Sequence, residues 1–319
     1  MQGPGYIRQQ AICDKMIMDI SDKGNRNRSC SSACRGTCKL TENNEKDCHT
    51  PLDFIRLSLI PGLGPVNQNR LLRICGSIDA CFEITEEELR RRDDTSDSGQ
   101  RIGTAKRRTF IANRECPDIK NRAEMIWKNC KEKCVTVITK DDERYPIRLK
   151  PLSDAPIILY TMGVLRINDF ACAAGIVGAR RCSGEGKQCA ITTAIDEVRR
   201  GTCIVSGMAK GIDSYAHTAA IKNGGYTIAV LGNGPDICYP KEHIRLYEEI
   251  IRSGTVISEY PPGTEAQRYM FSNRNRLIAG LSDKLCVIDA GRNSGTRTTV
   301  EAACRYGRKV NLLCCVSGE

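Results

Sequence analysis

The residues best suited to bind an anion follow a short apolar run, 173–177, that leads into Gly178. Arg180 and Arg181 stand in the polar, glycine-rich turn that comes next, and a helical pattern begins near residue 185. Glycines let a backbone approach a ligand closely, and the free N–H groups at a helix N-terminus attract phosphate. The arginines add fixed positive charge. The pattern therefore predicts a turn that grips the phosphates of a nucleic acid.

The loops after the next apolar runs have the same character. They combine glycines and small residues with basic and aromatic side chains, and they lie at 206–213, 232–241, 259–276 and 292–296. Cations beside aromatic rings suit phosphates and unstacked bases. We therefore take as candidate nucleic-acid-binding residues Gly178, Arg180, Ser206, Gly207, Lys210, Lys241, Phe271, Arg274, Asn275 and Arg276.

The prediction of a nucleic-acid-binding site depends mainly on two cations. We rank Arg180 first, against the alternative of a surface arginine paired with Glu185. Lys241 follows a proline and opens a helical pattern, where a positive charge is unfavourable unless an anion lies near it. Both side chains are therefore expected to face a bound polyanion.

The run around Arg274 and Arg276 leaves alternatives open. One of the two is expected to form a structural ion pair, with Asp289 or Glu259 as its partner, so that only the other reaches the ligand. Phe271 is as compatible with stacking on a base as with packing in the core.

Alternating strands and helices position these loops. Apolar runs predict strands at 173–177, 202–206, 226–231, 255–259, 284–289 and 309–314. Helical patterns lie between them, near 185–199, 212–222, 241–252, 273–281 and 296–306. Such alternation indicates βαβ crossovers and a parallel, doubly wound α/β sheet. Ligands bind at the carboxyl edge of such a sheet, so the basic loops should meet there.

A helical segment, 52–134, precedes this sheet. Residues 54–60 and 67–75 have helical spacing on either side of Pro61-Gly62-Leu63-Gly64-Pro65. This outline fits a helix-hairpin-helix whose turn amides hold a DNA phosphate, and it fits an ordinary turn between packed helices equally well. We expect a loop at 90–100.

The last part of this segment, 124–134, has the pattern of an amphipathic helix that carries Trp127. Two β-rich runs follow it, 135–139 and 157–160. The predicted division of the chain is an extension at 1–51, a helical domain at 52–134 and a sheet domain at 135–319.

The extension contains a cysteine cluster within a chain of 19 cysteines. Zinc sites usually use two ligand pairs at short spacing, whereas several of these cysteines stand four apart, which also fits one face of a helix. We expect a disordered or weakly helical tail and leave open whether metal binds Cys30, Cys34, Cys38, Cys48 and His49. We expect the other cysteines to be small, buried thiols that stay reduced.

The charge of the chain favours a polyanionic partner. Its formal net charge is +10, with 48 basic and 38 acidic residues. No apolar run approaches the roughly 20 residues of a membrane span. Residues 1–10 are polar and lack the apolar segment of a secretion signal. We therefore expect a soluble, cytoplasmic protein with no membrane partner.

Cofactor and catalytic motifs are missing. A Walker A loop would need glycine at Arg181 and Ser or Thr at Gln188, and a dinucleotide fingerprint would need glycine at Arg180. There is no nucleophile elbow and no zinc-protease motif. His217 is expected to be a packing histidine and His243 to face solvent. We therefore expect no cofactor and no catalytic residue.

Ordered motifs across about residues 52–314 resemble the DprA/Smf family of DNA-processing proteins. They are Gly178-Ala179-Arg180, 206–213 with Ala216-His217, 227–232, Tyr239-Pro240, 258–261, Phe271 with 274–276, and Ser294-Gly295-Thr296. The resemblance implies an extended Rossmann-like domain, preceded by a small helical domain of the helix-hairpin-helix or SAM-like type. It also implies a non-enzymatic homodimer that binds single-stranded DNA without a cofactor and delivers it to a RecA-type recombinase in natural transformation. Arg180, Lys241 and 274–276 would fall in the family's DNA-binding pocket.

The sequence departs from the family pattern in several places. Ala179 stands where the family usually has Ser, and Arg297 and Thr298 replace a usually apolar pair. We expect no winged-helix domain after Val310, although many members carry one. The cysteine-bearing extension is outside the pattern.

A second hypothesis for the function of this chain is an enzyme on a related fold, a nucleoside-monophosphate phosphoribohydrolase of the "lonely guy" type. Such enzymes need an acid at a fixed spacing after a Gly-Thr pair. The acid nearest to Gly295-Thr296 in the direction required is Glu301, two places too far along. On a helix this shift turns a side chain about 200° away from its target. We therefore favour DNA binding and keep the enzyme as the alternative.

Overall fold

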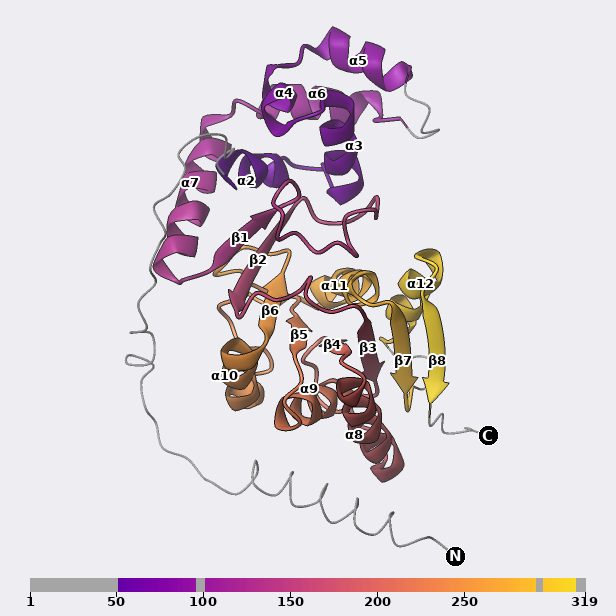
Figure 1. Cartoon of the computed structure of the whole chain (residues 1–319). Helices are drawn as coiled ribbons and strands as arrows, with labels where there is room; N and C mark the ends of the chain where they lie inside the picture. Colours follow the sequence, from indigo (N-terminus) through magenta and orange to yellow (C-terminus); the bar gives the residue numbers. More distant parts are fainter. Residues whose placement is uncertain (1–50, 96–100, 291–294, 314–319) are drawn as a thin grey trace, which may run out of the picture. The chain divides into compact units, whose positions relative to one another are not determined.

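The computed structural model describes residues 51–95, 101–290 and 295–313 (Figure 1). The cysteine cluster at 30–49 and its possible metal lie outside these residues. The cysteines within the described part are free thiols. Cys203 and Cys286 are buried as expected, whereas Cys304 is exposed.

Short helices make up the first part of the fold. They are α2 (Pro51–Leu59), α3 (Pro65–Cys75), α4 (Ile78–Glu83), α5 (Glu86–Asp94), α6 (Thr104–Asn113) and α7 (Pro117–Glu132). Gly62 takes a φ of 70° in the turn between α2 and α3, and Pro65 opens α3, where its missing N–H costs nothing. The helix–turn–helix outline and the amphipathic helix that carries Trp127 are therefore confirmed.

The prediction of a loop at 90–100 is wrong for its first residues, because helix α5 continues to Asp94. Thr85 caps this helix by accepting the N–H of Glu88 at 3.2 Å. Glu88 then pairs with Arg91 and Arg92 one turn further on. These local contacts stabilise a helix whose many charges suggest a loop. Residues 96–100 lie outside the described part.

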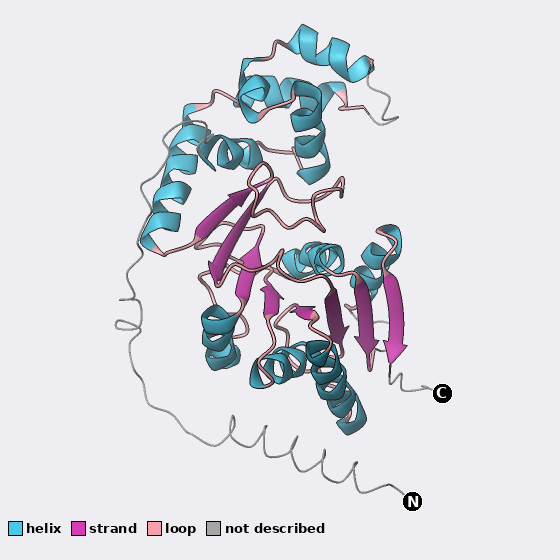
Figure 2. Ribbon diagram, viewed as in Figure 1, coloured by secondary structure: helices cyan, strands magenta, loops and turns pink. Residues whose placement is uncertain are grey.

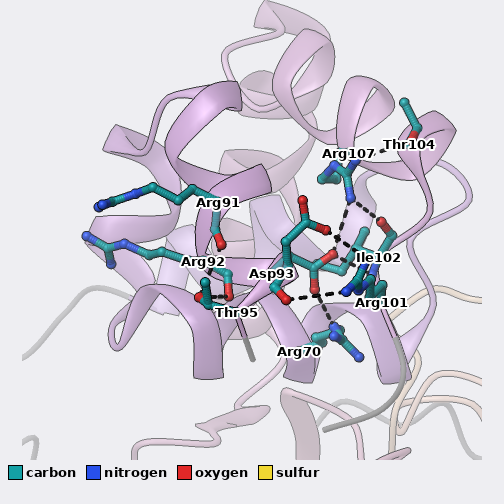
Figure 3. A network of polar contacts seen from close by, with 10 residues as sticks. Arg70, Arg91, Arg92, Asp93, Thr95, Arg101, Ile102, Thr104 and Arg107 are labelled. Atoms are coloured by element: carbon teal, nitrogen blue, oxygen red, sulfur yellow. Dashed lines mark hydrogen bonds and ion pairs between the residues drawn. The ribbon is translucent and has the colours of Figure 1, made fainter. Parts of the chain in front are cut away.

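A buried ion network holds α3, α5 and α6 together (Figure 3). Asp93 is fully buried and accepts hydrogen bonds from Arg70 Nε at 2.7 Å, from the Ile102 N–H at 2.8 Å and from Arg107 Nη1 at 3.3 Å. Arg107 also donates to Ile102 O at 2.7 Å. A carboxylate without water needs such partners, so the network fixes where the chain leaves α5 and enters α6.

The second part is an eight-stranded sheet in the order β1-β2-β6-β5-β4-β3-β7-β8. Its strands are β1 (Thr136–Thr139), β2 (Ile158–Gly163), β3 (Ala173–Gly178), β4 (Cys203–Ser206), β5 (Thr227–Val230), β6 (Thr255–Ser258), β7 (Lys284–Ile288) and β8 (Lys309–Leu313). Strands β3 to β8 are parallel, which confirms the predicted fold class. β2 pairs antiparallel with β6, and β1 with β2, so these two strands extend the sheet.

Helices cover both faces of this sheet (Figure 2). They are α8 (Gly184–Arg199), α9 (Ile212–Lys222), α10 (Ile244–Ser253) after the 3-10 turn η1 (Lys241–His243), α11 (Arg268–Leu281) and α12 (Arg297–Arg305). The chain steps from β3 through β4 and β5 to β6, then crosses back to β7 and on to β8. Because such crossovers are right-handed, α8, α9 and α10 share one face, and α11 and α12 share the other. In the described part no helix is long and apolar enough to cross a bilayer.

Candidate nucleic-acid interface

The loops after β3, β4 and β5 contact one another in order along the carboxyl edge of the sheet. The Ile212 N–H at the start of α9 donates to Ala179 O at 3.2 Å, which joins the first two loops. Lys210 Nζ lies 2.9 Å from Glu242 Oε1, and His243 Nδ1 lies 3.1 Å from Met208 O, which join the next two. These contacts hold the neighbouring loops together on one edge.

Arg180 and Lys241 are exposed cations on this edge, and Arg181, beside Arg180, is exposed as well. Neither the Arg180 side chain nor the Lys241 side chain forms a hydrogen bond or an ion pair with a residue that the structure describes, and the alternative pairing of Arg180 with Glu185 is absent among them. Lys210 is also exposed, but its charge is matched by Glu242. Arg180 and Lys241 are therefore available to a ligand from outside the chain.

An aromatic pair lies on the same edge. The rings of Tyr239 and Phe271 are 5.1 Å apart between centroids and are tilted by 34°. Tyr239 is 47% exposed and Phe271 is half-buried over Gly232. The candidate set omits Tyr239, although an aromatic residue two places before Lys241 is a signal that could have identified it.

The turn after β3 differs from the expected open phosphate cradle. The Ser183 N–H donates to Asp289 Oδ2 at 2.5 Å, and Ser183 Oγ accepts the Gly186 N–H at 2.9 Å. A Cβ on Gly186 would press against the same carboxylate. Asp289 thus occupies the Ser183 N–H, and Ser183 itself occupies the Gly186 N–H, at the N-terminus of α8. The exposed side chains of Arg180 and Arg181 remain available to a ligand in this turn.

The loop after β4 is also closed by an internal acid. Asp213 Oδ2 accepts the N–H groups of Gly207 and Ala209, both at 3.2 Å. Ser206 is fully buried and donates its hydroxyl to Ile176 O at 2.5 Å. Burial raises the pKa of Asp213, while the positive charge of Arg274 opposes this shift. Ser206 and Gly207 therefore shape the loop and present no free side chain at the edge.

Arg274 lies inside the protein. It is buried, and its Nη1 donates to Gly207 O at 2.6 Å and also to Val230 O. Burial lowers the pKa of its guanidinium to about 10, the nearby Asp213 opposes this shift, and Arg180 adds to it. The side chain thus ties the end of β5 to the loop after β4.

Arg276 and Asn275 also have partners within the fold. Arg276 Nη2 lies 2.6 Å from Glu259 Oε2, which is one of the ion pairs expected from the sequence. Asn275 Nδ2 donates to Thr298 Oγ1 at 2.8 Å and to Gly295 O at 3.1 Å. The expectation that either Arg274 or Arg276 would be open to the ligand is not met in this arrangement.

His217 is the packing residue that we expected. Thr227 donates its hydroxyl proton to Ile204 O at 2.9 Å, so His217 Nδ1 must donate to Thr227 Oγ1, 2.7 Å away. Burial lowers the pKa of this fully buried imidazole to about 3. The expectation for His243 is wrong, because it is half-buried against Met208.

A surface pocket of about 470 Å³ lies between α11 and α12, lined by Ser272, Asn273, Arg276, Thr298, Glu301, Ala302 and Arg305. Its charged groups are matched by partners within the chain: Arg276 by Glu259, Arg305 by Asp154, and Glu301 by Arg297 at 2.8 Å. Glu301, the acid considered for the enzymatic alternative, is thus held in an ion pair at the surface.

Comparisons with known proteins agree with this architecture. A family model described as DNA recombination-mediator protein A matches residues 136–316. The chain is 43% identical to the DNA processing protein DprA of Streptococcus pneumoniae over 53% of this chain and 59% of that protein. It is 32% identical to the protein Smf of Synechocystis over 82% of this chain and 63% of that protein. The chain thus spans about half to three fifths of the length of the curated relatives that it matches.

Two solved structures share the fold at about 30% identity. The X-ray structure of DprA from S. pneumoniae superposes with a TM-score of 0.68 at 31% identity, covering 83% of this chain and 86% of that one. A DprA structure from Helicobacter pylori, described for its single-stranded DNA binding mode, has a TM-score of 0.53 at 30% identity, covering 58% and 83%. Because the family model matches more than half of the residues, this chain belongs to the DNA recombination-mediator protein A family, which includes the DprA and Smf proteins.

Proposed function

We propose that this protein binds single-stranded DNA along the carboxyl edge of its sheet and acts as a carrier of the strand without catalysing a reaction. The proposal depends on one observation: Arg180 and Lys241, two exposed cations without a charge partner among the described residues, lie on the same edge of the sheet as the Tyr239–Phe271 aromatic pair. No cofactor enters this proposal.

The two kinds of group act on different parts of a strand. Arg180 and Lys241 attract phosphates and release the counterions condensed on them, which makes binding strong at low salt and independent of sequence. An exposed aromatic ring stacks on an unpaired base, and this contact is not available inside a duplex. The edge should therefore prefer single strands to duplex DNA.

The other predicted residues support this edge from within. Arg274, Ser206 and Gly207 fix the loop after β4, and Asn275 fixes the start of α12. Lys210 and Arg276 carry charges that are matched in the free protein, and they reach DNA only if their partners release them. Gly178 has no room for a side chain, because a Cβ there would collide with Ile288 O, so it contributes to the edge only through its backbone.

We extend the proposal to the biological role by way of the relatives. The H. pylori protein is described for single-stranded DNA binding, and the S. pneumoniae protein is named for DNA processing. By this analogy the present chain is a cytoplasmic homodimer that hands its strand to a RecA-type recombinase during DNA uptake. The proposed units are a helical domain at 52–134 and a DNA-binding domain at 135–319.

A binding titration tests the proposal. Fluorescence anisotropy of a labelled oligo-dT strand should show that Arg180→Ala and Lys241→Ala each weaken binding by about 1–3 kcal/mol, because a charged contact and ordered stacking are lost together. Arg252→Ala, an exposed arginine in the last turn of α10, is the matched control and should bind as the unaltered protein does. Unchanged affinity in both edge variants would reject the site.

A further inference from the structure

The loop that carries Tyr239 and Lys241 is anchored by one acid, Asp236. Its Oδ1 accepts the Gly263 N–H at 2.8 Å, and its Oδ2 accepts from Lys133 Nζ at 2.6 Å. The side chain of Asp236 is only 10% exposed, and that of Lys133 is 41% exposed. A carboxylate in this position joins segments that are far apart in the sequence.

Further contacts make the loop rigid on both sides of Asp236. The Gly234 N–H donates to Thr264 O at 2.9 Å, and Tyr247 OH donates to Pro235 O. Asn233 Nδ2 donates to Ile237 O at 2.7 Å. The backbone from 233 to 237 is therefore fixed just before it reaches the exposed ring of Tyr239 and the free charge of Lys241.

Lys133 brings the helical part of the fold into this arrangement. It directly follows α7, and its N–H donates to Asn129 O at 3.0 Å, so it caps that helix. A cation is favourable at the C-terminus of a helix, which gives Lys133 a fixed starting point for its reach to Asp236. The ion pair connects residues 103 positions apart.

We propose that Asp236 is a positioning residue for single-stranded DNA binding. It holds the Tyr239–Lys241 segment in its binding position and, through Lys133, makes the affinity of the edge depend on the end of α7. This inference rests on the proposed function. A rigid edge binds more tightly because less ordering is required when the strand arrives.

The sign of the effect distinguishes positioning from simple electrostatics. Asp236 is a negative charge near a site for a polyanion, so its removal should strengthen binding if charge alone mattered. We expect the opposite: Asp236→Ala should weaken oligo-dT binding about tenfold, because the loop loses its anchor. Asp236→Asn retains an acceptor for the Gly263 N–H and should recover part of the loss. Glu265→Gln, which removes an exposed acid two places after Gly263, is the control and should bind equally or more tightly.

A double-mutant cycle shows whether Asp236 acts through Lys241. If it does, Asp236→Ala should change the affinity less than about twofold in a Lys241→Ala background, because coupled residues are not additive. Lys133→Ala should reproduce a weaker form of the defect without lowering the dependence of log Kd on log salt, whereas loss of a direct phosphate contact on a single strand would lower that slope by about 0.7. Lys133 is partly exposed, so its variant is the informative one if Asp236→Ala does not fold.

The outcomes separate this inference from the proposed function. Binding by Asp236→Ala as tight as that of the unaltered protein, or additive effects in the cycle, would overturn the positioning role while leaving the edge in place. A Lys241→Ala variant with full affinity would instead remove the site on which the inference depends.

Discussion

Arg274 lies directly against Gly207, with its Nη1 donating to Gly207 O at 2.6 Å. A Cβ on Gly207 would collide with the guanidinium, so the loop after β4 and the side chain from α11 fit only when this position is a glycine. The buried cation has an acid, Asp213, near it. A residue that the sequence placed among the ligand contacts is therefore part of the support beneath them.

Removal of Arg274 should consequently reduce stability as well as DNA binding. Arg274→Ala removes the buried cation near Asp213 and the donor to the carbonyl oxygens of Gly207 and Val230, and we expect the free energy of unfolding to fall by about 3–5 kcal/mol. Urea titration followed by circular dichroism measures this loss. Arg180→Ala, which alters an exposed side chain, should stay within about 0.5 kcal/mol of the unaltered protein. Equal stability of the two variants would contradict the buried role of Arg274.

The hydrogen-bond network of Asp93 predicts a large loss of stability when this residue is replaced, although it lies far from the proposed DNA-binding edge. Asp93→Ala removes the shared acceptor of Arg70 and Arg107, and we expect it to cost about 3–5 kcal/mol of stability because buried cations are left unpaired. The matched control is Asp94→Ala, whose exposed pair with Arg101 should contribute less than about 1 kcal/mol. Thermal melts of the two variants compare neighbouring acids that differ in burial.

His217 predicts a loss of stability in acid. Its pKa in the folded protein is about 3, below the ordinary value of 6.5, so the unfolded chain binds the proton more readily between these limits. The contribution of neutral His217 to the free energy of unfolding is fully present above about pH 6.5. It should fall by up to about 1.4 kcal/mol for each pH unit toward pH 3. His217→Gln should flatten this part of the stability–pH curve. An unchanged slope in that variant would assign the acid sensitivity to other groups.

The aromatic pair predicts a preference for strands that carry bases. Tyr239→Ala and Phe271→Ala should each weaken oligo-dT binding, by about 1–3 kcal/mol where a base is stacked. An abasic strand of equal length keeps the phosphates and lacks the rings, so its affinity should respond little to either variant. If both strands lose affinity equally, the variants have disturbed the loops and the rings do not stack on bases.

The regular part of the fold was predictable because its signals are local. The short apolar runs before Gly178 and Ser206, each ending in Ile-Val, indicate buried parallel strands, and the alternation of strand and helix patterns indicates the crossovers. The predicted start of α11 is too late, because Tyr269, Met270 and Phe271 are consecutive and do not show the three-to-four-residue spacing of a helix face. The antiparallel pairing of β2 with β6 depends on partners far apart in sequence, such as Tyr160 and Ser258.

Of the candidate site, only the exposed charged residues could be predicted from the sequence. Arg180 and Lys241 were selected from residue type and loop position, and the structure leaves both unmatched among the described residues. The burial of Arg274 depends on the carbonyl groups of Gly207 and Val230, which become neighbours only after the sheet forms. The closing of the α8 N-terminus by Asp289 is likewise long-range, and no spacing rule would reveal it.

The most direct test of the DNA-binding edge is the salt dependence of oligo-dT affinity in a double variant. Arg180→Ala combined with Lys241→Ala should reduce the slope of log Kd against log salt by about 1.4, because two phosphate contacts on a single strand are lost. A control pair at the opposite edge of the sheet, Arg252→Ala with Lys309→Ala, has the same change in net charge and should keep the original slope. Equal slopes in the two double variants would contradict the assignment of the edge.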